Sequence, residues 1–278
     1  MIAADVVAAV IQQSRGALAS AGMERREFNG TVYWIGGRAQ AGRAEARPTL
    51  VLLHGVNDQA GTFAAVVPAL LKHYCVVIPD LPGHGESEPK QGPIEMSMIL
   101  ERVSAIVDHE NLRCFTLAGN SFGGWLAILY ALAHPDRVEY LVLEDGGGLA
   151  RPPGVPFVAT DRETAERILR AVHGPDYVAP DWAVEALYAR AKDSPLLRLT
   201  GLFDYFVDAR LKELQVPTTI VWGENDGVVP FSYIEALQDG IANAKLKIIK
   251  NAGHIPHAQQ PEQFLSCLTE ISSPNARE

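Results

Sequence analysis

Residues 114–133 have the sequence CFTLAGNSFGGWLAILYALA, in which a short apolar run, a serine bordered by glycines and a longer apolar run follow one another. The first run predicts a strand over Cys114–Ala118, and the second predicts a helix over Phe122–Ala133. Between them, residues 119–123 fit the pattern G-x-S-x-G, which places Ser121 on a tight turn from strand to helix. The glycines let the backbone pass close by without a Cβ clash. The stretch therefore predicts a serine nucleophile at the carboxyl end of a buried strand.

Short apolar runs and longer helical patterns alternate along most of the chain. Strands that are buried on both faces form unbroken apolar runs, so this alternation predicts a mostly parallel sheet with helices on both faces. In such a sheet, the loops at the carboxyl ends of the strands form the site. The expected strands are Thr49–Leu53, Tyr74–Pro79, Cys114–Ala118, Val138–Glu144, Thr218–Trp222 and Leu246–Ile249, and the expected helices are Phe63–His73, Met96–Glu110, Phe122–Ala133, Phe231–Ile241 and Gln260–Ile271.

Two further elements are expected before this alternation begins. The Asn29-Gly30 turn predicts an antiparallel hairpin of Arg26–Phe28 and Thr31–Ile35. Residues 1–22 predict a helix rather than a cleaved leader, because no basic start is present and Asp5 interrupts the apolar segment. The helix lacks the lysines that membrane-surface helices usually carry, so contact with a membrane surface is the less favoured alternative, and we expect the helix to pack on the body of the protein. The side chains expected to make this contact are Ile2, Val6, Val7, Val10 and Ile11.

Composition limits the classes of partner and compartment. The chain has 278 residues, of which 47% are hydrophobic, and a net charge of −9, which argues against a nucleic-acid partner. Cys75, Cys114 and Cys267 form no CxxC pair, so we expect buried reduced thiols, a reducing compartment and a cytoplasmic location. No stretch of 18 apolar residues is present, and no G-x-G-x-x-G or G-x-x-x-x-G-K-[ST] motif occurs. We therefore expect a small-molecule partner and no cofactor, and the oligomeric state stays open.

Residues 150–212 differ from the rest of the chain. They open with Arg151-Pro152-Pro153-Gly154, show helical patterns without a convincing strand, and contain seven aromatic side chains. We interpret this region as a helical cap over the site, inserted into a core formed by residues 1–149 and 213–278. Aromatic side chains in a cap suit an apolar substrate group.

A serine hydroxyl needs a base, and the base needs an acid that fixes its tautomer. His254 lies in a loop directly after the expected strand Leu246–Ile249, and Asp226 follows the expected strand Thr218–Trp222. The order Ser121, Asp226, His254 along the chain is the order that this kind of sheet predicts. Asp145 and Glu144, at the end of the preceding strand, are the alternative acids. His257, three residues after His254, is expected in a loop or at a helix start, and the pair lacks the third ligand of a zinc site, so no metal is expected.

A developing oxyanion needs backbone donors. The Phe122 N–H follows the nucleophile and opens a helix. The second donor is expected in the loop after Thr49–Leu53, where His54-Gly55 precedes Val56. We therefore predict the Val56 and Phe122 N–H groups as the oxyanion hole, with His54-Gly55 contributing through the backbone and not through the imidazole.

Five segments together resemble the α/β-hydrolase superfamily, in its serine-nucleophile branch with a helical cap. The resemblance implies an eight-stranded, mostly parallel sheet with helices on both faces and a cap after the sixth strand. It also implies a Ser121, Asp226 and His254 triad that works without metal or cofactor. Serine stands where the related haloalkane dehalogenases use aspartate, which argues against dehalogenation. The matching segments are HGVND (54–58), DLPGHGES (80–87), GNSFGG (119–124), WGENDGVVP (222–230) and AGHIPHAQQPEQF (252–264).

The expected activity is hydrolysis of carboxylic esters with lipophilic acyl or aryl groups through an acyl-enzyme. The alternative is carbon–carbon bond hydrolysis of a vinylogous 1,3-diketone. Asn120 before the serine resembles such enzymes, but they typically carry tryptophan shortly after the catalytic histidine, where this chain has Ile255, Pro256 and His257. Cofactor-free perhydrolases, acyltransferases and small-molecule receptors that keep the triad are further alternatives.

Overall fold

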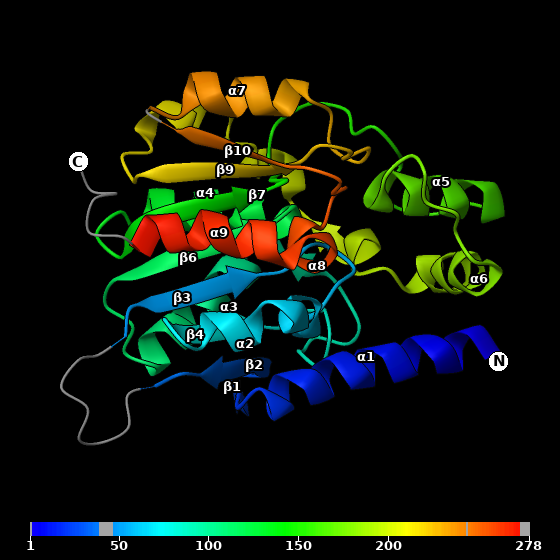
Figure 1. The fold of residues 1–278 in the computed structure, drawn as a ribbon, viewed down its shortest axis with the longest axis horizontal. Coiled ribbons are helices and arrows are strands. Elements are labelled where there is room, and N and C mark those ends of the chain that lie inside the picture. The colour runs from blue at the N-terminus through cyan, green and yellow to red at the C-terminus, as the bar shows by residue number, and fades with distance from the viewer. Residues whose placement is uncertain (1, 39–46, 243, 273–278) are drawn as a thin grey trace.

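An eight-stranded sheet runs through the middle of the computed structural model, which describes residues 2–38, 47–242 and 244–272 (Figure 1). β2 is antiparallel to its neighbours β1 and β4, and every other neighbouring pair is parallel. The predicted mostly parallel sheet is therefore confirmed. In spatial order its strands are β1 (Glu24–Phe28), β2 (Thr31–Gly36), β4 (Cys75–Pro79), β3 (Thr49–Leu53), β6 (Phe115–Asn120), β7 (Val138–Glu144), β9 (Thr218–Gly223) and β10 (Lys245–Ile249).

The first two strands form the predicted hairpin. Asn29 and Gly30 both have positive φ, 48° and 70°, and Phe28 pairs with Thr31 across the turn. Positive φ at both central residues is the turn geometry whose twist matches that of antiparallel strands. The Asn-Gly dipeptide therefore determines the hairpin locally.

Helices cover both faces of the sheet, because the central strands are apolar on both sides. One face is packed by α3 (Met96–His109), α4 (Phe122–Ala133) and α7 (Ser232–Gly240). The other is packed by the end of α1 (Ile2–Ser20), the 3₁₀ helix η1 (Ala60–Ala65), α2 (Val67–Leu70) and α9 (Pro261–Ser272), with the short α8 (Pro256–Gln259) before α9. The predicted α/β architecture thus holds across the whole sheet.

The expected single helix over Phe63–His73 is wrong. The chain forms η1 and the one-turn helix α2 instead, and Pro68 lies in the first turn of α2. Proline lacks an N–H and clashes with the preceding turn, so it is tolerated at a helix start and not in an interior. A continuous helix through this position is therefore replaced by two short ones.

The segment between β7 and β9 contains α5 (Arg162–His173), α6 (Asp181–Arg190) and four 3₁₀ helices, and we call residues 150–212 the cap. α5 and α6 lie together at one end of the molecule, and α6 packs against α1 (Figure 1). The cap also contains a strand that the sequence did not predict, because a two-residue strand has no periodicity to recognise: β8 (Leu199–Thr200) pairs in parallel with β5 (Ile94–Glu95). The 3₁₀ helices are η2 (Ala191–Asp193), η3 (Pro195–Arg198), η4 (Leu202–Tyr205) and η5 (Asp208–Glu213).

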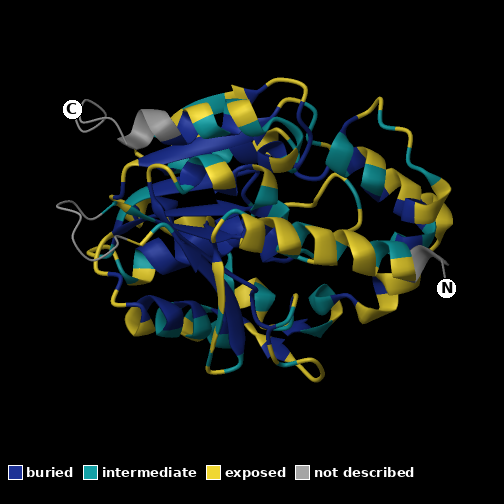
Figure 2. Ribbon diagram, turned by 60° about the horizontal axis from the view of Figure 1, so that its bottom comes forward, coloured by how far each residue is buried: buried dark blue, intermediate teal, exposed yellow. Residues whose placement is uncertain are grey.

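The N-terminal helix α1 has a largely exposed outer surface (Figure 2). Leu18 is fully buried and Val6, Val7 and Ile11 are partly buried, but Val10 is 51% exposed, so its expected contact with the body is wrong. The side chain of Ile2 lies outside the described residues. Over the described ranges, we find no helix with both the length and the apolarity needed to span a bilayer.

The expected burial of the cysteines holds for two of them. Cys75 and Cys267 are buried, whereas Cys114 is exposed. β6 begins one residue later than predicted, at Phe115, and Cys114 therefore precedes the buried part of the strand.

Candidate active site

Ser121 lies between β6 and α4 in a backbone conformation that is rare for a residue with a side chain. Its φ is +53° and its ψ is −114°. Such conformations cost about 1–3 kcal/mol and persist where the surrounding structure holds them. Here the Ser121 N–H donates to the Glu144 carbonyl at 2.8 Å, and the Ser121 carbonyl accepts from the Gly147 N–H at 3.1 Å. The end of β7 thus holds the turn that presents the serine.

The glycines around Ser121 are required by close backbone contacts. A Cβ at Gly119 would lie 2.2 Å from the Gly123 carbonyl oxygen, and a Cβ at Gly123 would lie 2.2 Å from the Leu53 carbonyl oxygen. Both contacts are with backbone atoms, which cannot move aside as a flexible side chain could. The G-x-S-x-G pattern therefore reflects the packing of β6 against the start of α4 and the end of β3.

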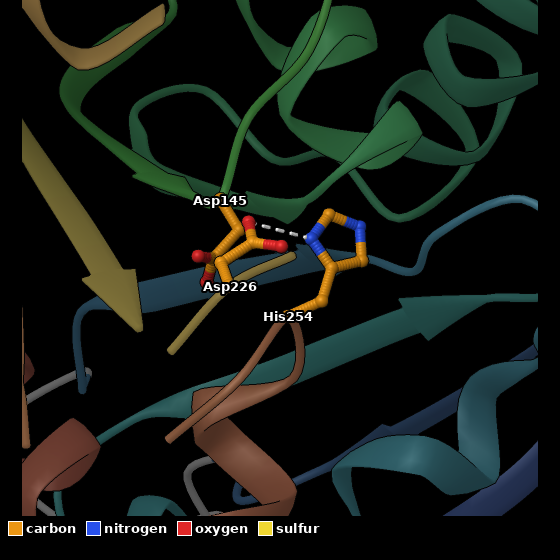
Figure 3. A group of neighbouring side chains, drawn as sticks. All are labelled: Asp145, Asp226 and His254. Atoms are coloured by element: carbon orange, nitrogen blue, oxygen red, sulfur yellow. Dashed lines mark hydrogen bonds and ion pairs between the residues drawn. The ribbon is translucent and has the colours of Figure 1, made fainter. Parts of the chain in front are cut away.

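Asp226 and His254 are joined as predicted. His254 Nδ1 lies 2.9 Å from Asp226 Oδ2, and the side chains are 8% and 0% exposed (Figure 3). The other carboxylate oxygen, Oδ1, accepts from the N–H groups of Val228 and Val229 at 2.7 and 3.2 Å. A carboxylate held in this way favours the His254 tautomer with a proton on Nδ1, which leaves Nε2 to accept a proton.

Ser121 is linked to His254 through the side chain of Asn120. The buried Asn120 amide donates from Nδ2 to the His254 carbonyl at 2.9 Å and to the Glu144 carbonyl at 3.4 Å. Within the described part of the chain, the Ser121 hydroxyl itself makes no hydrogen bond to the imidazole. Catalytic hydrogen bonds are often long before substrate binds. The sequence singled out Asn120 only for its position before the serine, and its contact with His254 is a finding of the structure.

The predicted oxyanion donors lie in the expected loops. A Cβ at Gly55 would lie 3.5 Å from Ser121 Cβ, so the loop that contains Val56 passes beside the serine. Among the described residues, no acceptor is bound by the N–H of Val56 or by that of Phe122. Both ring nitrogens of His54 face backbone groups. Nε2 accepts from the Leu81 N–H at 2.9 Å, and Nδ1 lies 2.8 Å from the Gly55 carbonyl oxygen.

Glu144, one of the alternative acids, contacts a different histidine. Both its carboxylate oxygens lie 2.9 Å from His257 Nδ1, and both side chains are buried. His257 Nε2 lies 2.9 Å from Thr62 Oγ1. The pair therefore connects the end of β7 with α8 and η1, and of the two expected placements of His257, loop or helix start, the structure shows the helix start.

Asp145, the other alternative acid, is fully buried next to Asp226. Its Oδ1 accepts from the Gly223 N–H at 2.9 Å. Burial, and then the negative charges of Asp226 and Glu144, raise the pKa of Asp145 well above the ordinary value of an aspartate. One carboxyl oxygen each of Asp145 and Asp226 and one ring nitrogen of His254 lie within 4.8 Å of one another. The expectation of a metal-free site stays a prediction.

The last turn of α5 binds both loops that carry Asp226 and His254. The Ala171 carbonyl accepts from the Gly227 N–H at 3.0 Å, and the Val172 carbonyl accepts from the His254 N–H at 2.8 Å. A Cβ at Gly253 would lie 2.2 Å from the Val172 carbonyl oxygen, so glycine is needed for this approach. The cap therefore directly positions the loops that carry Asp226 and His254.

A cavity of about 570 Å³ lies between the cap, α1 and the loops at the carboxyl ends of β3 and β4. Its lining includes Asn57 and His173, the sequence neighbours of Val56 and Val172, but does not include Ser121, Asp226 or His254. Most of its cap wall is apolar or aromatic, and Val7 of α1 contributes on the opposite side. Burial lowers the pKa of His173, so this side chain is neutral at neutral pH. Apolar residues from the cap include Phe157, Val158, Leu169, Trp182 and Leu187.

Comparison with known proteins relates the chain to hydrolases. The model of the alpha/beta hydrolase family matches residues 50–266. A 2-hydroxy-6-oxononadienedioate/2-hydroxy-6-oxononatrienedioate hydrolase of Pseudomonas putida is 32% identical over 247 residues, covering 79% of this chain and 86% of that protein. A pimeloyl-[acyl-carrier protein] methyl ester esterase of Aeromonas hydrophila is 30% identical over 243 residues, covering 80% and 94%.

The fold has close counterparts among solved structures. The crystal structure of a membrane phospholipase A, described as a bacterial virulence factor, superposes with a TM-score of 0.77 at 25% identity, covering 98% of this chain and 93% of that one. The chain thus forms the predicted eight-stranded sheet, and its fold is shared with this solved structure. The chain belongs to the alpha/beta hydrolase family.

Proposed function

We propose that the chain is a serine hydrolase that cleaves carboxylic esters of lipophilic acyl or aryl groups through an acyl-enzyme. The observation that carries the proposal is the hydrogen bond of 2.9 Å between His254 Nδ1 and the buried Asp226, at the same sheet edge as Ser121. The similarity to an ester esterase and to a phospholipase supports an ester as the substrate.

The proposed reaction uses five groups of the chain. Ser121 Oγ attacks the ester carbonyl while His254 Nε2 takes its proton, and Asp226 stabilises the imidazolium. The Val56 and Phe122 N–H groups bind the oxyanion. His254 then passes the proton to the leaving alcohol, and the acyl group stays on Ser121. Water, deprotonated by His254, attacks this acyl-enzyme, releases the acid and restores the serine.

The cavity favours an uncharged, apolar group. Its cap wall is rich in aliphatic and aromatic side chains, and such walls bind apolar surface. Its charged lining is one arginine, Arg190, and two aspartates, Asp58 and Asp193. A dianionic substrate would therefore meet more negative than positive charge. This balance supports a neutral acyl or aryl ester over a dicarboxylate.

Hydrolysis of p-nitrophenyl esters with increasing acyl length tests the proposal. We expect turnover with a burst of p-nitrophenol, because the acyl-enzyme forms before it is hydrolysed. Ser121→Ala should remove the burst and lower kcat at least about 10³-fold with little change in Tm. Ser20→Ala, at the exposed end of α1, is the matched control. Full activity of Ser121→Ala would remove Ser121 from its role.

Carbon–carbon bond hydrolysis is the second candidate. It is favoured by the 32% identity to a dienedioate hydrolase and by Asn120, which connects the nucleophile strand to His254. A vinylogous 1,3-diketone belongs in the same substrate panel. Cleavage of the diketone without ester turnover would favour this candidate, and ligand-induced stabilisation with no turnover of either would favour a receptor. Perhydrolysis, acyl transfer and the cytoplasmic location stay predictions.

A further inference from the structure

Asp145 occupies an unusual position beside the predicted acid and base. It directly follows β7, has a positive φ of 45° and is 0% exposed. Its carboxyl lies side by side with that of Asp226, on the side of Asp226 away from the imidazole (Figure 3). Two carboxyl groups therefore share one water-excluded space behind His254.

The hydrogen-bond donors around this pair are divided unequally. Asp226 accepts from two backbone N–H groups and from the imidazole of His254. Asp145 accepts one N–H, that of Gly223, and among the described residues its Oδ2 has no donor. Donors stabilise an ionised carboxylate. Asp226 is therefore the member of the pair whose negative charge is stabilised by hydrogen-bond donors.

The charged groups around Asp145 also disfavour its ionisation. Two carboxylates in one buried space do not both ionise readily. Asp226 faces Asp145 from the loop after β9, and Glu144 precedes it on β7, while His257 pairs with Glu144 and His254 pairs with Asp226. Burial is the largest of the causes that raise the pKa of Asp145, and only the Gly223 N–H opposes them among the groups named. A proton on Asp145 would resolve both the charge conflict and the missing partner of Oδ2.

We propose that Asp145 is a positioning residue that stays protonated at neutral pH and donates a hydrogen bond from Oδ2 to the carboxylate of Asp226. Its catalytic consequence rests on the proposed serine-hydrolase function. The hydrogen bond fixes the Asp226 carboxylate from the side opposite to His254 and draws off part of its negative charge. The imidazolium formed during the reaction is then stabilised less than by a lone carboxylate, so His254 returns its proton to the leaving group more readily.

The protonation of Asp145 can be observed without any activity. In protein labelled with ¹³C at the aspartate carboxyl carbons, the signal that Asp145→Asn removes belongs to Asp145. We expect this signal to have the shift of a carboxylic acid at pH 7. A carboxylate shift at pH 7 would overturn the proposal. Asp136→Asn, which replaces an exposed aspartate, controls for general changes of the spectrum. Because no substrate is used, this result is independent of the proposed function.

The effect on His254 separates positioning from a structural role. The imidazole titration is followed by NMR and identified by its loss in His254→Gln. Asp145→Asn keeps one acceptor and one donor in place of the protonated acid, so the midpoint should stay within about 0.3 pH units of the wild type. A fall of one unit or more would mean that a full negative charge had been removed, and would overturn the proposal.

Removal of the donor should have the opposite effect. In Asp145→Ala, Asp226 keeps its full charge, so the His254 midpoint and the acid limb of kcat/KM should both rise by about half a pH unit or more. The Asn variant should recover most of any loss of kcat that the Ala variant shows. Equal losses in both variants with unmoved midpoints would mean that Asp145 only supports the fold. If the Ala variant does not fold, the His254 midpoint of the Asn variant and the carboxyl signal of Asp145 still test the proposal.

Discussion

At the scale of single residues, the site depends on side chains that their neighbours restrict to one hydrogen-bond pattern. Asp226 has both oxygens occupied by donors, and His254 has Nδ1 occupied by Asp226, so Nε2 is the nitrogen left for a reacting proton. Asn120 holds the backbone of His254 through a hydrogen bond to its carbonyl. Among the described residues, the Ser121 hydroxyl makes no hydrogen bond to the His254 imidazole. We expect substrate binding to bring these two groups into contact.

Replacement of Asp226 tests the acid. In Asp226→Asn, the amide can offer its oxygen either to His254 or to the N–H groups of Val228 and Val229, and its NH₂ then faces a donor on the other side. We expect kcat for p-nitrophenyl ester hydrolysis to fall by up to about 10⁴-fold, because the imidazole tautomer is no longer fixed. Asp136→Asn should have no effect. A loss of this size in Asp145→Asn, without one in Asp226→Asn, would assign the acid to Asp145.

The residue scale also shows what the sequence could predict of the site. Ser121, Asp226 and His254 could be found because each follows a strand whose carboxyl end faces the same edge of the sheet. The roles of Asn120 and Asp145 could not be found in this way. Their contacts join positions far apart in the chain, such as Asn120 with His254, and depend on how neighbouring loops pack.

At the scale of elements, prediction succeeded where the apolar residues of a segment follow one clear pattern. β3, α4 and β7 were predicted with the residue boundaries that the structure shows, because a cluster of apolar residues dominates each segment. Prediction failed where a single residue or a distant contact decides the structure. Pro68 divides the segment after β3, and β5 with β8 forms a two-residue pairing that only the folded chain brings together.

The turn between β6 and α4 should tolerate added volume poorly. Gly123→Ala would place a Cβ 2.2 Å from the Leu53 carbonyl oxygen, so β3 and α4 would have to separate. We expect a loss of stability of about 2 kcal/mol or more, as for other overpacked interiors, measured by chemical denaturation.

Gly16→Ala is the control for the glycine experiment. Gly16 lies inside α1, and a Cβ there meets no atom within 4 Å. Alanine favours a helix over glycine by up to about 1 kcal/mol, so this variant should be slightly more stable than the wild type. A Gly123→Ala protein as stable as Gly16→Ala would show that the turn tolerates a Cβ, contrary to the geometry.

At the scale of the whole molecule, burial on both faces of the sheet leaves titratable groups in the interior. His84 is 2% exposed, and in the described structure its Nε2 has no hydrogen-bond partner. Burial, and then the nearby His54, lower the pKa of His84 to about 3. The unfolded chain therefore binds a proton at this site below about pH 6.5, whereas the folded protein does not.

Acid should therefore destabilise the fold through His84. Because the unfolded state binds more protons between pH 6.5 and about 3, the free energy of unfolding falls as the pH falls through this window. The contribution of this residue between pH 7 and pH 5 is about 2 kcal/mol. His84→Gln should show a shallower loss of stability over the same range in chemical denaturation, and His73→Gln, at an exposed position, should not. Equal slopes for wild type and His84→Gln would show that His84 titrates normally in the folded protein.

The hydrogen bonds from the last turn of α5 to Gly227 and His254 have a consequence for how substrate reaches the serine. A swinging motion of the whole cap would break these hydrogen bonds or displace the loops of Asp226 and His254, so we expect the α5 side of the cap to stay in place. α6 contacts the N-terminal helix, and Trp182 and Val7 line the same cavity, so under the proposed function we expect substrate to enter on this side of the cap. The expected entrance for substrate and the support of the predicted catalytic loops thereby lie on different helices of the cap, α6 and α5.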